Sequence, residues 1–332
     1  MKILFNLLGT GISNNGGSRT LIRSANILKK IGEDVILLNN KLNHIYTWDK
    51  IEVPILSPNT INDIPNADVV IGTGYGSWKK TIDLPNRCGK KFIWCRGWEI
   101  WQAPENKLIE LLGDKKINLI VNSIGLQDKL KEFNIDSEII RPGYDIHELR
   151  PLNNRQKNKI ITIGGLYNKG DKRKTKRVEW IFEVVRRLKK DMNICLVMFG
   201  ADGSPDVHDP FDVFITNPVY ERKNDIYNSC DLWLAPTEND SLHNPPAEAM
   251  LTECCVVATD TPMNGMKDYL INMKTGLISD NNINDFERCV RMMIDNPDIR
   301  IKLGIAGREK ILSLGTREYN MTLLLNYLED NL

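Results

Sequence analysis

The chain has 332 residues, long enough for two domains, and its 42% hydrophobic and 26% charged residues are typical of an ordinary globular protein. Its 44 basic and 43 acidic residues leave a net charge of +1, which excludes a general electrostatic attraction to nucleic acid or anionic lipid. Seven cysteines without a Cys-x-x-Cys pair argue against a complete disulfide framework and favour a reducing, cytoplasmic setting.

The first predicted elements are a strand, a glycine-containing loop and a helix. Residues 2–8 are apolar and too short for a signal peptide or a membrane span, so we expect a buried strand. Gly16 and Gly17 lie near the end of the following loop, and the helix covers residues 19–31. This layout can hold a phosphate, although it lacks the Gly-x-Gly-x-x-Gly spacing; a mobile surface loop is the alternative.

Two further apolar runs predict strands in the first half of the chain. Residues 67–76 end in glycines, as in dinucleotide-binding enzymes, but Pro85 leaves no room for a full crossover helix, and we discount a dehydrogenase. The other strand ends just before Arg96, which lies where doubly wound folds bind ligands. Trp98 and Trp101 then form either an aromatic face for a sugar or a base, or part of the core.

A polar run at residues 153–159 predicts a hinge between two domains. We therefore expect a first domain of residues 1–152 and a second domain of residues 153–315. The second begins with a strand over residues 160–163, and a glycine pair and a basic loop follow. An amphipathic helix is expected next, over residues 178–188.

Residues 231–260 are the most informative stretch of the chain. They predict a buried strand, a loop, a helix capped by Asn244 with Pro245 in its first turn, and a second strand. In such a parallel crossover unit the positive end of the helix dipole lies at the carboxyl ends of the strands and suits a phosphate. Asp240 and Glu248 flank that point; because carboxylates repel phosphate, we expect them to bind sugar hydroxyls.

This stretch resembles the signature of the retaining glycosyltransferases of family 4, which are glycogen-synthase-like enzymes. Their pattern is proline, three residues, Glu-Gly-Phe-Gly-Leu-Pro, two residues and Glu-Ala-Met. Pro236, Glu248 and the Ala-Met that follows fall in register. Asp240 stands in place of the first glutamate, and Ser241 and His243 stand in place of the two glycines.

The resemblance implies an α/β fold of two Rossmann-like, doubly wound parallel-sheet domains facing each other across a cleft, the GT-B fold. Residues 142–145 are similar to the phrase that ends the first domain in the family, and residues 264–268 to its Gly-Gly-x-x-Glu, with Asp268 as the acidic residue. The last helix, in residues 316–332, is then expected to cross back to the first domain.

The resemblance also implies roles for individual residues. Glu248 is expected to accept hydrogen bonds from a ribose, Asp240 to orient the donor sugar, and Lys176 to neutralise the departing diphosphate. Arg96 takes the place of a family histidine near the reacting sugar, and the two tryptophans that follow it are candidates for acceptor binding. The further donor-binding positions are Gly16, Gly17, Arg19, Gly164, Gly165, Lys169, Arg177, His243, Asn244 and Pro245.

The loop before residue 178 departs from the family pattern. A Gly-Arg-Leu strand end and a Lys-Gly before the helix supply an arginine and a lysine to the diphosphate in the family. Gly165 stands in place of that arginine. Counting back from the helix makes Lys176 the family lysine, with Arg177 in place of its glycine, while Lys169 followed by glycine is the alternative.

The expected function is transfer of a sugar, with retention of configuration, from a UDP- or GDP-linked donor to an acceptor hydroxyl of a glycan, a lipid-linked molecule or a small molecule. No metal is expected, because cations and a helix N-terminus can stabilise the leaving diphosphate in its place. The spacing of the acidic residues around His208 also fits no calcium or zinc template. The cytoplasm is the expected setting, and peripheral membrane contact stays open because family substrates are often lipid-linked. The alternatives are a non-catalytic or epimerase relative that binds a sugar nucleotide and a transferase acting on a nucleic-acid base, with nucleic acid the least favoured partner.

Overall fold

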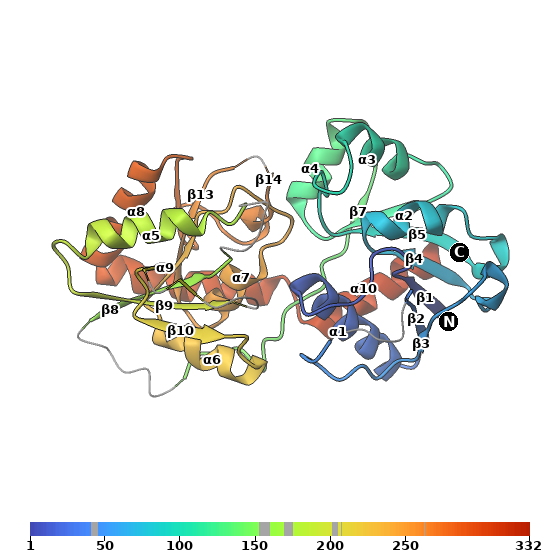
Figure 1. The fold of residues 1–332 in the computed structure, drawn as a ribbon, viewed down its shortest axis with the longest axis horizontal. Coiled ribbons are helices and arrows are strands. Elements are labelled where there is room, and N and C mark those ends of the chain that lie inside the picture. Colours follow the sequence, from blue (N-terminus) through green and yellow to red (C-terminus); the bar gives the residue numbers. More distant parts are fainter. Residues whose placement is uncertain (41–45, 153–159, 169–174, 201–204, 207, 262) are drawn as a thin grey trace. The chain divides into compact units, whose positions relative to one another are not determined.

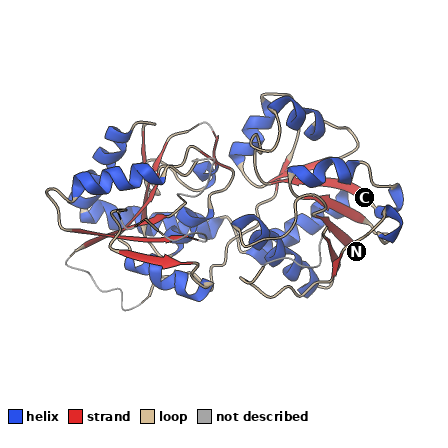
Figure 2. Cartoon of the chain, in the orientation of Figure 1, coloured by secondary structure: helices blue, strands red, loops and turns tan. Residues whose placement is uncertain are grey.

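The computed structural model describes residues 1–40, 46–152, 160–168, 175–200, 205–206, 208–261 and 263–332. They form two compact units, which we call the first unit (Met1–Gly143 with Arg317–Leu332) and the second unit (Tyr144–Thr316). Figure 1 labels the elements of both, and Figure 2 shows strands and helices combined in each. Each unit is therefore of the predicted α/β class.

A seven-stranded parallel sheet forms the centre of the first unit, in the order β3-β2-β1-β4-β5-β6-β7. Alternate residues of β1 serve different cores: Ile3 and Phe5 pack on one face and Leu4 on the other. The strand order reverses between β1 and β4, the arrangement expected of a doubly wound sheet. The strands are Lys2–Asn6 (β1), Asp34–Leu38 (β2), Ile55–Leu56 (β3), Val69–Gly72 (β4), Lys90–Cys95 (β5), Asn118–Val121 (β6) and Glu138–Ile139 (β7).

The helices of the first unit include one from the end of the chain. Helix α10 buries Leu324 and Leu328 in the core that α1 also covers, because it packs beside α1. We expected too little room for a crossover helix before Pro85, but a helix of two turns, α2, fits there. The helices are Gly16–Lys30 (α1), Tyr75–Ile82 (α2), Glu105–Leu112 (α3), Ile124–Lys131 (α4) and Arg317–Asp330 (α10), with 3₁₀ turns at Ile61–Asp63 and Asn86–Cys88.

The second unit has a six-stranded parallel sheet in the order β10-β9-β8-β11-β13-β15 and a separate parallel pair, β12-β14. Its two faces again carry separate cores: Phe199 of β9 packs with residues of α6 and α7, while Met198 packs with residues of α5 and α8. The strands are Ile161–Leu166 (β8), Ile194–Gly200 (β9), Val213–Thr216 (β10), Leu232–Ala235 (β11), Asn239–Asp240 (β12), Cys255–Thr259 (β13), Met263–Asn264 (β14) and Leu277–Ser279 (β15). The helices are Val178–Leu188 (α5), Tyr220–Ser229 (α6), Asn244–Leu251 (α7), Ile283–Asp295 (α8) and Pro297–Ser313 (α9), with a 3₁₀ turn at Gly265–Asp268.

The chain passes from one unit to the other at Gly143, before the hinge that we predicted at residues 153–159. Residues 144–152 belong to the second unit because α6 binds them. The side-chain oxygen of Asn224 accepts the Arg150 N–H at 2.9 Å, and that of Asn228 accepts the Leu152 N–H at 2.9 Å. The predicted hinge itself lies outside the described residues.

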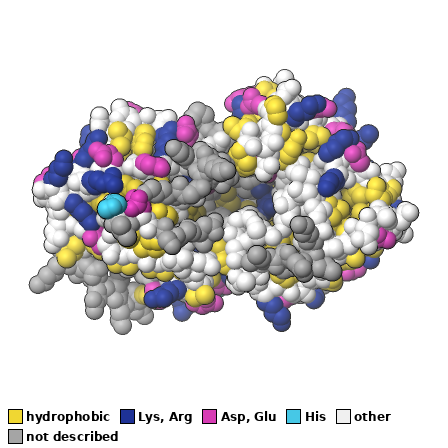
Figure 3. Space-filling model, in the orientation of Figure 1, with side chains coloured by type: hydrophobic (Ala, Val, Ile, Leu, Met, Phe, Trp, Pro, Cys, Tyr) yellow, Lys and Arg dark blue, Asp and Glu magenta, His cyan; other side chains and the backbone are white. Residues whose placement is uncertain are grey.

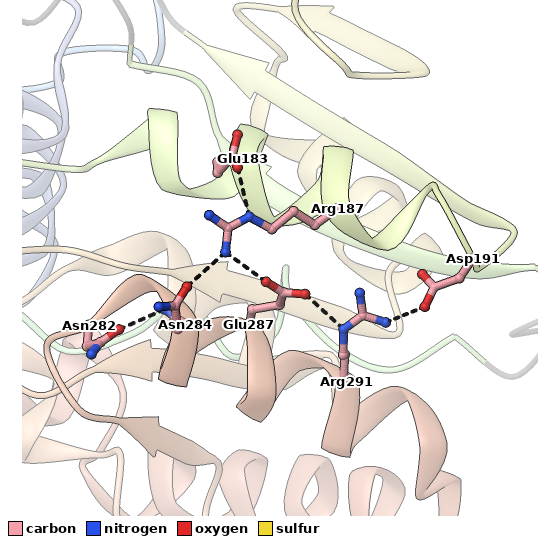
Figure 4. A network of polar contacts seen from close by, with 7 residues as sticks. All are labelled: Glu183, Arg187, Asp191, Asn282, Asn284, Glu287 and Arg291. Carbon is pink, nitrogen blue, oxygen red and sulfur yellow. Dashed lines mark hydrogen bonds and ion pairs between the residues drawn. The ribbon is translucent and has the colours of Figure 1, made fainter.

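Ion pairs join α5 to α8, as Figure 4 shows. Arg187 of α5 places Nε 2.7 Å from Glu183 and Nη1 3.0 Å from Glu287 of α8. Arg291 of α8 places Nε 2.9 Å from Glu287 and Nη1 2.9 Å from Asp191. Burial alone would raise the pKa of Glu287, but the bonds from both arginines outweigh it and the pKa is lowered. The network therefore fixes α5, which begins beside Lys176, against α8.

The molecular surface carries mixed charge. Basic and acidic side chains are interspersed among hydrophobic ones on the face drawn in Figure 3, in keeping with the net charge of +1. Within the described parts of the chain, no helix is long and apolar enough to cross a membrane, and no cluster of three or more His, Cys, Asp or Glu side chains is placed to hold a metal ion. The seven cysteines are all free thiols.

Candidate active site

The connection from β11 to α7 turns at His243. This residue has φ 46° and ψ 75°, in the left-handed region that favours glycine, and the glycosyltransferase signature has glycine at this position. Two tertiary contacts hold the turn. The Tyr269 hydroxyl donates to the His243 carbonyl oxygen at 2.7 Å, and a Cβ atom added to Gly265 would lie only 2.1 Å from the Ser241 carbonyl oxygen. Gly265 therefore allows the close approach that positions this turn.

Asp240, Lys176 and His243 form a cluster beside the turn. The Lys176 ammonium and the Asp240 carboxylate make a direct ion pair, and their side chains are 17% and 22% exposed. Burial alone would raise the pKa of Asp240, but the charge of Lys176, its hydrogen bond and the contacts with His243 together outweigh burial and hold the pKa well below its usual range. Burial, followed by the charge of Lys176, lowers the pKa of His243 to about 3. At neutral pH the cluster thus holds a cation, a carboxylate and a neutral imidazole.

The N-terminus of α7 offers fewer hydrogen-bond donors than we expected. We predicted Asn244 as the helix cap, but His243 holds that position and makes no side-chain capping bond, because the helix already begins at Asn244. Pro245 and Pro246 have no N–H, and the His243 N–H bonds to the Asp240 carboxylate. Of the four positions at this helix end, 243–246, Asn244 is the one whose N–H has no hydrogen bond to the described residues.

Glu248, on α7, is held by two side chains from α6. The Tyr227 hydroxyl donates to Glu248 Oε2 at 2.6 Å, and the Lys223 ammonium lies 3.6 Å from the same oxygen. The side chains of Glu248 and Lys223 are 12% and 15% exposed. Tyr227 and Lys223 were not among the site residues predicted from the sequence. Their spacing of one helical turn places both on one face of the helix before β11, but nothing in the sequence shows what that face contacts.

Arg177 precedes α5 with φ 48° and ψ 47°, again left-handed where the family has glycine. This conformation supports Lys176 as the counterpart of the family lysine. The ion pair between Lys176 and Asp240, which stands at the first glutamate of the signature, supports the same assignment. The Arg177 guanidinium lies 3.1 Å from Glu238 Oε1 and 4.6 Å from the centre of the Trp180 ring. The alternative, Lys169, lies outside the described residues.

Gly164 and Gly165 lie inside β8, not at an open strand end. Gly164 pairs with Val197 of β9 and with Trp233 of β11, so its backbone serves the sheet. A Cβ atom at Gly164 would lie 2.5 Å from the Trp233 ring, and one at Gly165 would lie 3.0 Å from Ile181 Cδ1. Both glycines make room for packed side chains. The prediction that they contact the donor is therefore not supported by their placement.

In the first unit, Arg96 joins the first turn of α1 to the residue that follows β4. Its Nη1 donates to the Gly17 carbonyl oxygen at 2.5 Å, and its Nη2 donates to the Thr73 carbonyl oxygen at 3.1 Å. Burial lowers its pKa to about 10, so the guanidinium stays charged at neutral pH. Gly16 begins α1, and a Cβ atom there would meet no atom within 4 Å. Arg96 thus places a fixed positive charge beside the first turn of α1.

Arg19 is paired within the first unit. Its Nε lies 3.3 Å from Asp49 Oδ2, Arg23 Nη2 lies 2.7 Å from Asp49 Oδ1, and the Tyr46 hydroxyl donates to Asp49 at 2.5 Å. Arg19 is only 8% exposed. Burial alone would raise the pKa of Asp49, but the charge of Arg19 and the further bonds lower it. Because Asp49 neutralises the charge of Arg19 within the first unit, the placement of Arg19 does not support the predicted donor contact.

The two tryptophans near Arg96 have different surroundings. Trp98 is 2% exposed, stacks on Phe133 with ring centroids 6.0 Å apart and planes at 8°, and donates to Glu105 at 3.0 Å. Of the two alternatives for Trp98, an aromatic face or part of the core, its placement supports the core, because both its ring and its N–H are used in packing. Trp101 is 42% exposed, so its ring is accessible for stacking.

Comparison with known proteins found a sequence similarity that lies within the second unit. Residues 157–296 match the family model described as glycosyl transferases group 1. The resemblance to glycosyltransferases is confirmed at this level. No curated protein sequence matched the chain. The family 4 assignment stays a prediction.

Several solved structures have a similar fold over almost the whole chain. A glycosyltransferase from Rickettsia africae is 14% identical with a TM-score of 0.78, and a sucrose-phosphate synthase from Thermosynechococcus elongatus is 12% identical with a TM-score of 0.77; each match covers 99% of this chain and 98% of the other. HepE from Anabaena, solved in complex with UDP and glucose, is 12% identical with a TM-score of 0.75 and coverages of 99% and 100%. At these identities the likeness shows the fold, which is the predicted GT-B class.

Proposed function

We propose that the chain is a glycosyltransferase that moves a sugar, with retention of configuration, from a nucleotide-diphosphate sugar to an acceptor hydroxyl. The observation that carries this proposal is the Lys176–Asp240 ion pair at the turn before α7. A cation there suits a diphosphate, and an ionised carboxylate suits sugar hydroxyls. Glu248 adds a second carboxylate on the same strand–turn–helix unit, for the ribose. The group 1 match over these residues supports the proposal.

In the proposed reaction the bond between the anomeric carbon and the diphosphate oxygen breaks, and the acceptor oxygen bonds to that carbon on the same face. The departing diphosphate gains negative charge and takes the acceptor's proton. Lys176 and the positive end of the α7 dipole stabilise that charge more in the transition state than in the ground state. Asp240 is a weak base because Lys176 holds its pKa low, so it suits orienting a hydroxyl rather than attacking carbon. We propose that these fixed charges make a metal unnecessary.

The donor and the acceptor are proposed as chemical classes. A UDP or GDP sugar fits the donor site, and the complex of HepE with UDP and glucose favours UDP as the first probe. The exposed ring of Trp101 and the charge of Arg96 favour an acceptor site on the first unit, for a glycan, a lipid-linked molecule or a small molecule. We place the enzyme in the cytoplasm, with peripheral membrane contact if the acceptor is lipid-linked.

Replacing Glu248 by alanine tests the donor site. We expect UDP affinity to fall about 10- to 100-fold, because hydrogen bonds to a charged group are lost. Isothermal titration calorimetry on the full chain measures this directly. Glu221→Ala, which removes an exposed carboxylate from the first turn of α6, should leave the affinity unchanged. Equal UDP affinity in wild type and Glu248→Ala would contradict the ribose role.

A non-catalytic binder and an epimerase are the alternatives to a transferase. The binder is raised by two departures from the family pattern, Asp240 in place of glutamate and Gly165 in place of arginine, and the epimerase is raised because such enzymes share the fold. Incubation with UDP-glucose separates the three functions. A transferase releases UDP slowly by hydrolysis even without its acceptor, an epimerase changes the sugar without releasing UDP, and a binder leaves UDP-glucose intact.

A further inference from the structure

We propose that Tyr227 is a positioning residue for ribose recognition. Together with Lys223 it holds Glu248 in the orientation that accepts the ribose hydroxyls, and it thereby sets the preference for a ribonucleotide over a 2′-deoxyribonucleotide. This inference rests on the proposed function, in which Glu248 binds the ribose. It extends that function to α6, to which the family resemblance assigned no role.

The Tyr227 hydroxyl has a fixed position because its ring is enclosed. Tyr227 is fully buried, with the Phe199 ring centroid 5.9 Å away at 82° and the Trp233 ring centroid 5.0 Å away at 64°. These edge-on contacts come from β9 and β11, on the same side of the sheet. Gly164 allows the arrangement, since a Cβ atom there would lie 2.5 Å from the Trp233 ring. The sheet therefore holds the hydroxyl in place before any ligand binds.

Lys223 is positioned in a similar way. Its ammonium lies 5.4 Å from the ring centroid of Phe199 and 5.4 Å from that of Tyr220, over two aromatic faces. The same ammonium lies 3.6 Å from Glu248 Oε2, the oxygen that also accepts the Tyr227 hydroxyl. A carboxylate normally rotates easily about its last torsion. Two partners on one oxygen select a single orientation of the Glu248 carboxylate plane.

A carboxylate held in one orientation increases both the affinity for the nucleotide and the preference for its ribose form. A group already oriented in the free protein loses little freedom when the ligand binds. A site built to accept a hydroxyl rejects an analogue lacking it, because its buried acceptor is left without that bond. Removing the Tyr227 hydroxyl lets the Glu248 carboxylate turn away from its productive orientation. The bond to the ribose hydroxyl weakens, while contacts that do not involve that hydroxyl persist.

Calorimetry on the full-length Tyr227→Phe variant, with UDP and 2′-deoxy-UDP, tests the inference. The GDP pair replaces them if wild type binds GDP and not UDP. We expect wild type to prefer the ribonucleotide about 10-fold or more, and the variant to prefer it by no more than about 3-fold, through lost affinity for the ribonucleotide. Tyr167→Phe is the matched control: it lies in the core on the other face of the sheet and loses a comparable bond, from its hydroxyl to Asp209 at 3.2 Å, and it should keep the wild-type preference.

The outcomes separate this inference from the proposed function. A Tyr227→Phe variant that keeps the wild-type preference overturns the inference. Equal losses for both nucleotides overturn it too, because they indicate a merely structural role. If wild type binds UDP without preferring the ribose form, the inference fails while nucleotide binding stands. If wild type binds neither UDP nor GDP, the proposed function fails and the inference fails with it. Lys223→Met, which should also reduce the preference, replaces Tyr227→Phe should that variant unfold.

Discussion

At the residue scale, His243 and Arg177 adopt a backbone conformation that usually requires glycine. Both are left-handed, at φ 46° and φ 48°, where the family patterns have glycine. A left-handed conformation costs a non-glycine residue about 1–2 kcal/mol. Each side chain has a new contact: His243 Nδ1 lies 3.2 Å from the Thr237 hydroxyl, and Arg177 pairs with Glu238. These contacts help to hold both residues in the left-handed conformation.

His243 also makes stability depend on pH. Its pKa is lowered from 6.5 to about 3 in the folded protein, so between these values the unfolded chain binds a proton that the folded chain does not. Stability is therefore lost as the pH falls below 6.5. From pH 7 to pH 5 the titration of this residue should lower the free energy of unfolding by about 2 kcal/mol. Asparagine tolerates the left-handed turn and does not titrate. The unfolding free energy of His243→Asn, measured with urea, should therefore fall by about 2 kcal/mol less than that of wild type from pH 7 to pH 5. Equal losses in the two proteins would contradict the assignment.

The carboxylates and their partners differ in how far the sequence could predict them. Asp240, Glu248 and Lys176 could be predicted as candidate site residues because the family pattern can be aligned on local strand, turn and helix signals. Tyr227 and Lys223 could not, because a tyrosine and a lysine on a helix are usually surface or core residues. Their role appears only when α6 packs against α7.

At the scale of elements, the turn between β11 and α7 depends on a segment that follows it in the chain. Gly265 begins the 3₁₀ turn after β14, and its missing side chain lets the backbone of residues 241–242 pass. Strand β14 pairs with β12, which carries Asp240. The Gly-Gly-x-x-Glu-like stretch of the sequence thus supports the signature turn.

Gly265→Ala should disturb this turn. Its Cβ atom would lie 2.1 Å from the Ser241 carbonyl oxygen, so one backbone segment must move. We expect a loss of about 1–3 kcal/mol in unfolding free energy, together with weaker UDP binding. Thermal unfolding and calorimetry measure the two effects. Gly16→Ala, where a Cβ atom meets nothing within 4 Å, should not reduce stability. A Gly265→Ala protein as stable as wild type would show that the turn does not need this close approach.

At the scale of the whole molecule, the last helix completes the first unit although the second unit precedes it in sequence. Met321, Leu324 and Leu328 of α10 are buried against the sheet of the first unit, and Tyr327 meets Phe92 edge-on at 6.1 Å. The first unit is therefore complete only when both ends of the chain are present. Loss of the last helix would expose its core.

Leu324→Ala tests this arrangement. Leu324 is fully buried, so we expect the first unit to lose about 2–5 kcal/mol of stability. The adjacent Leu323 is 39% exposed, and Leu323→Ala should cost less than about 0.5 kcal/mol. UDP affinity should be unchanged in both variants, because we place the donor site on the second unit. Differential scanning calorimetry and a UDP titration provide the measurements. Loss of UDP binding in Leu324→Ala alone would contradict a donor site confined to the second unit.

The sequence by itself determined the two α/β units and the stretch that carries the site, because residue periodicity, turn residues and motif spacing are local properties of a chain. Only the tertiary structure decided which of those residues meet. It pairs Lys176 with Asp240, 64 residues apart, and Tyr227 with Glu248, 21 residues apart. It also uses Trp98 and Gly164 for packing. The physical reason is that burial and pairing follow from the order of strands in each sheet, which brings distant segments together and is not written in any local pattern.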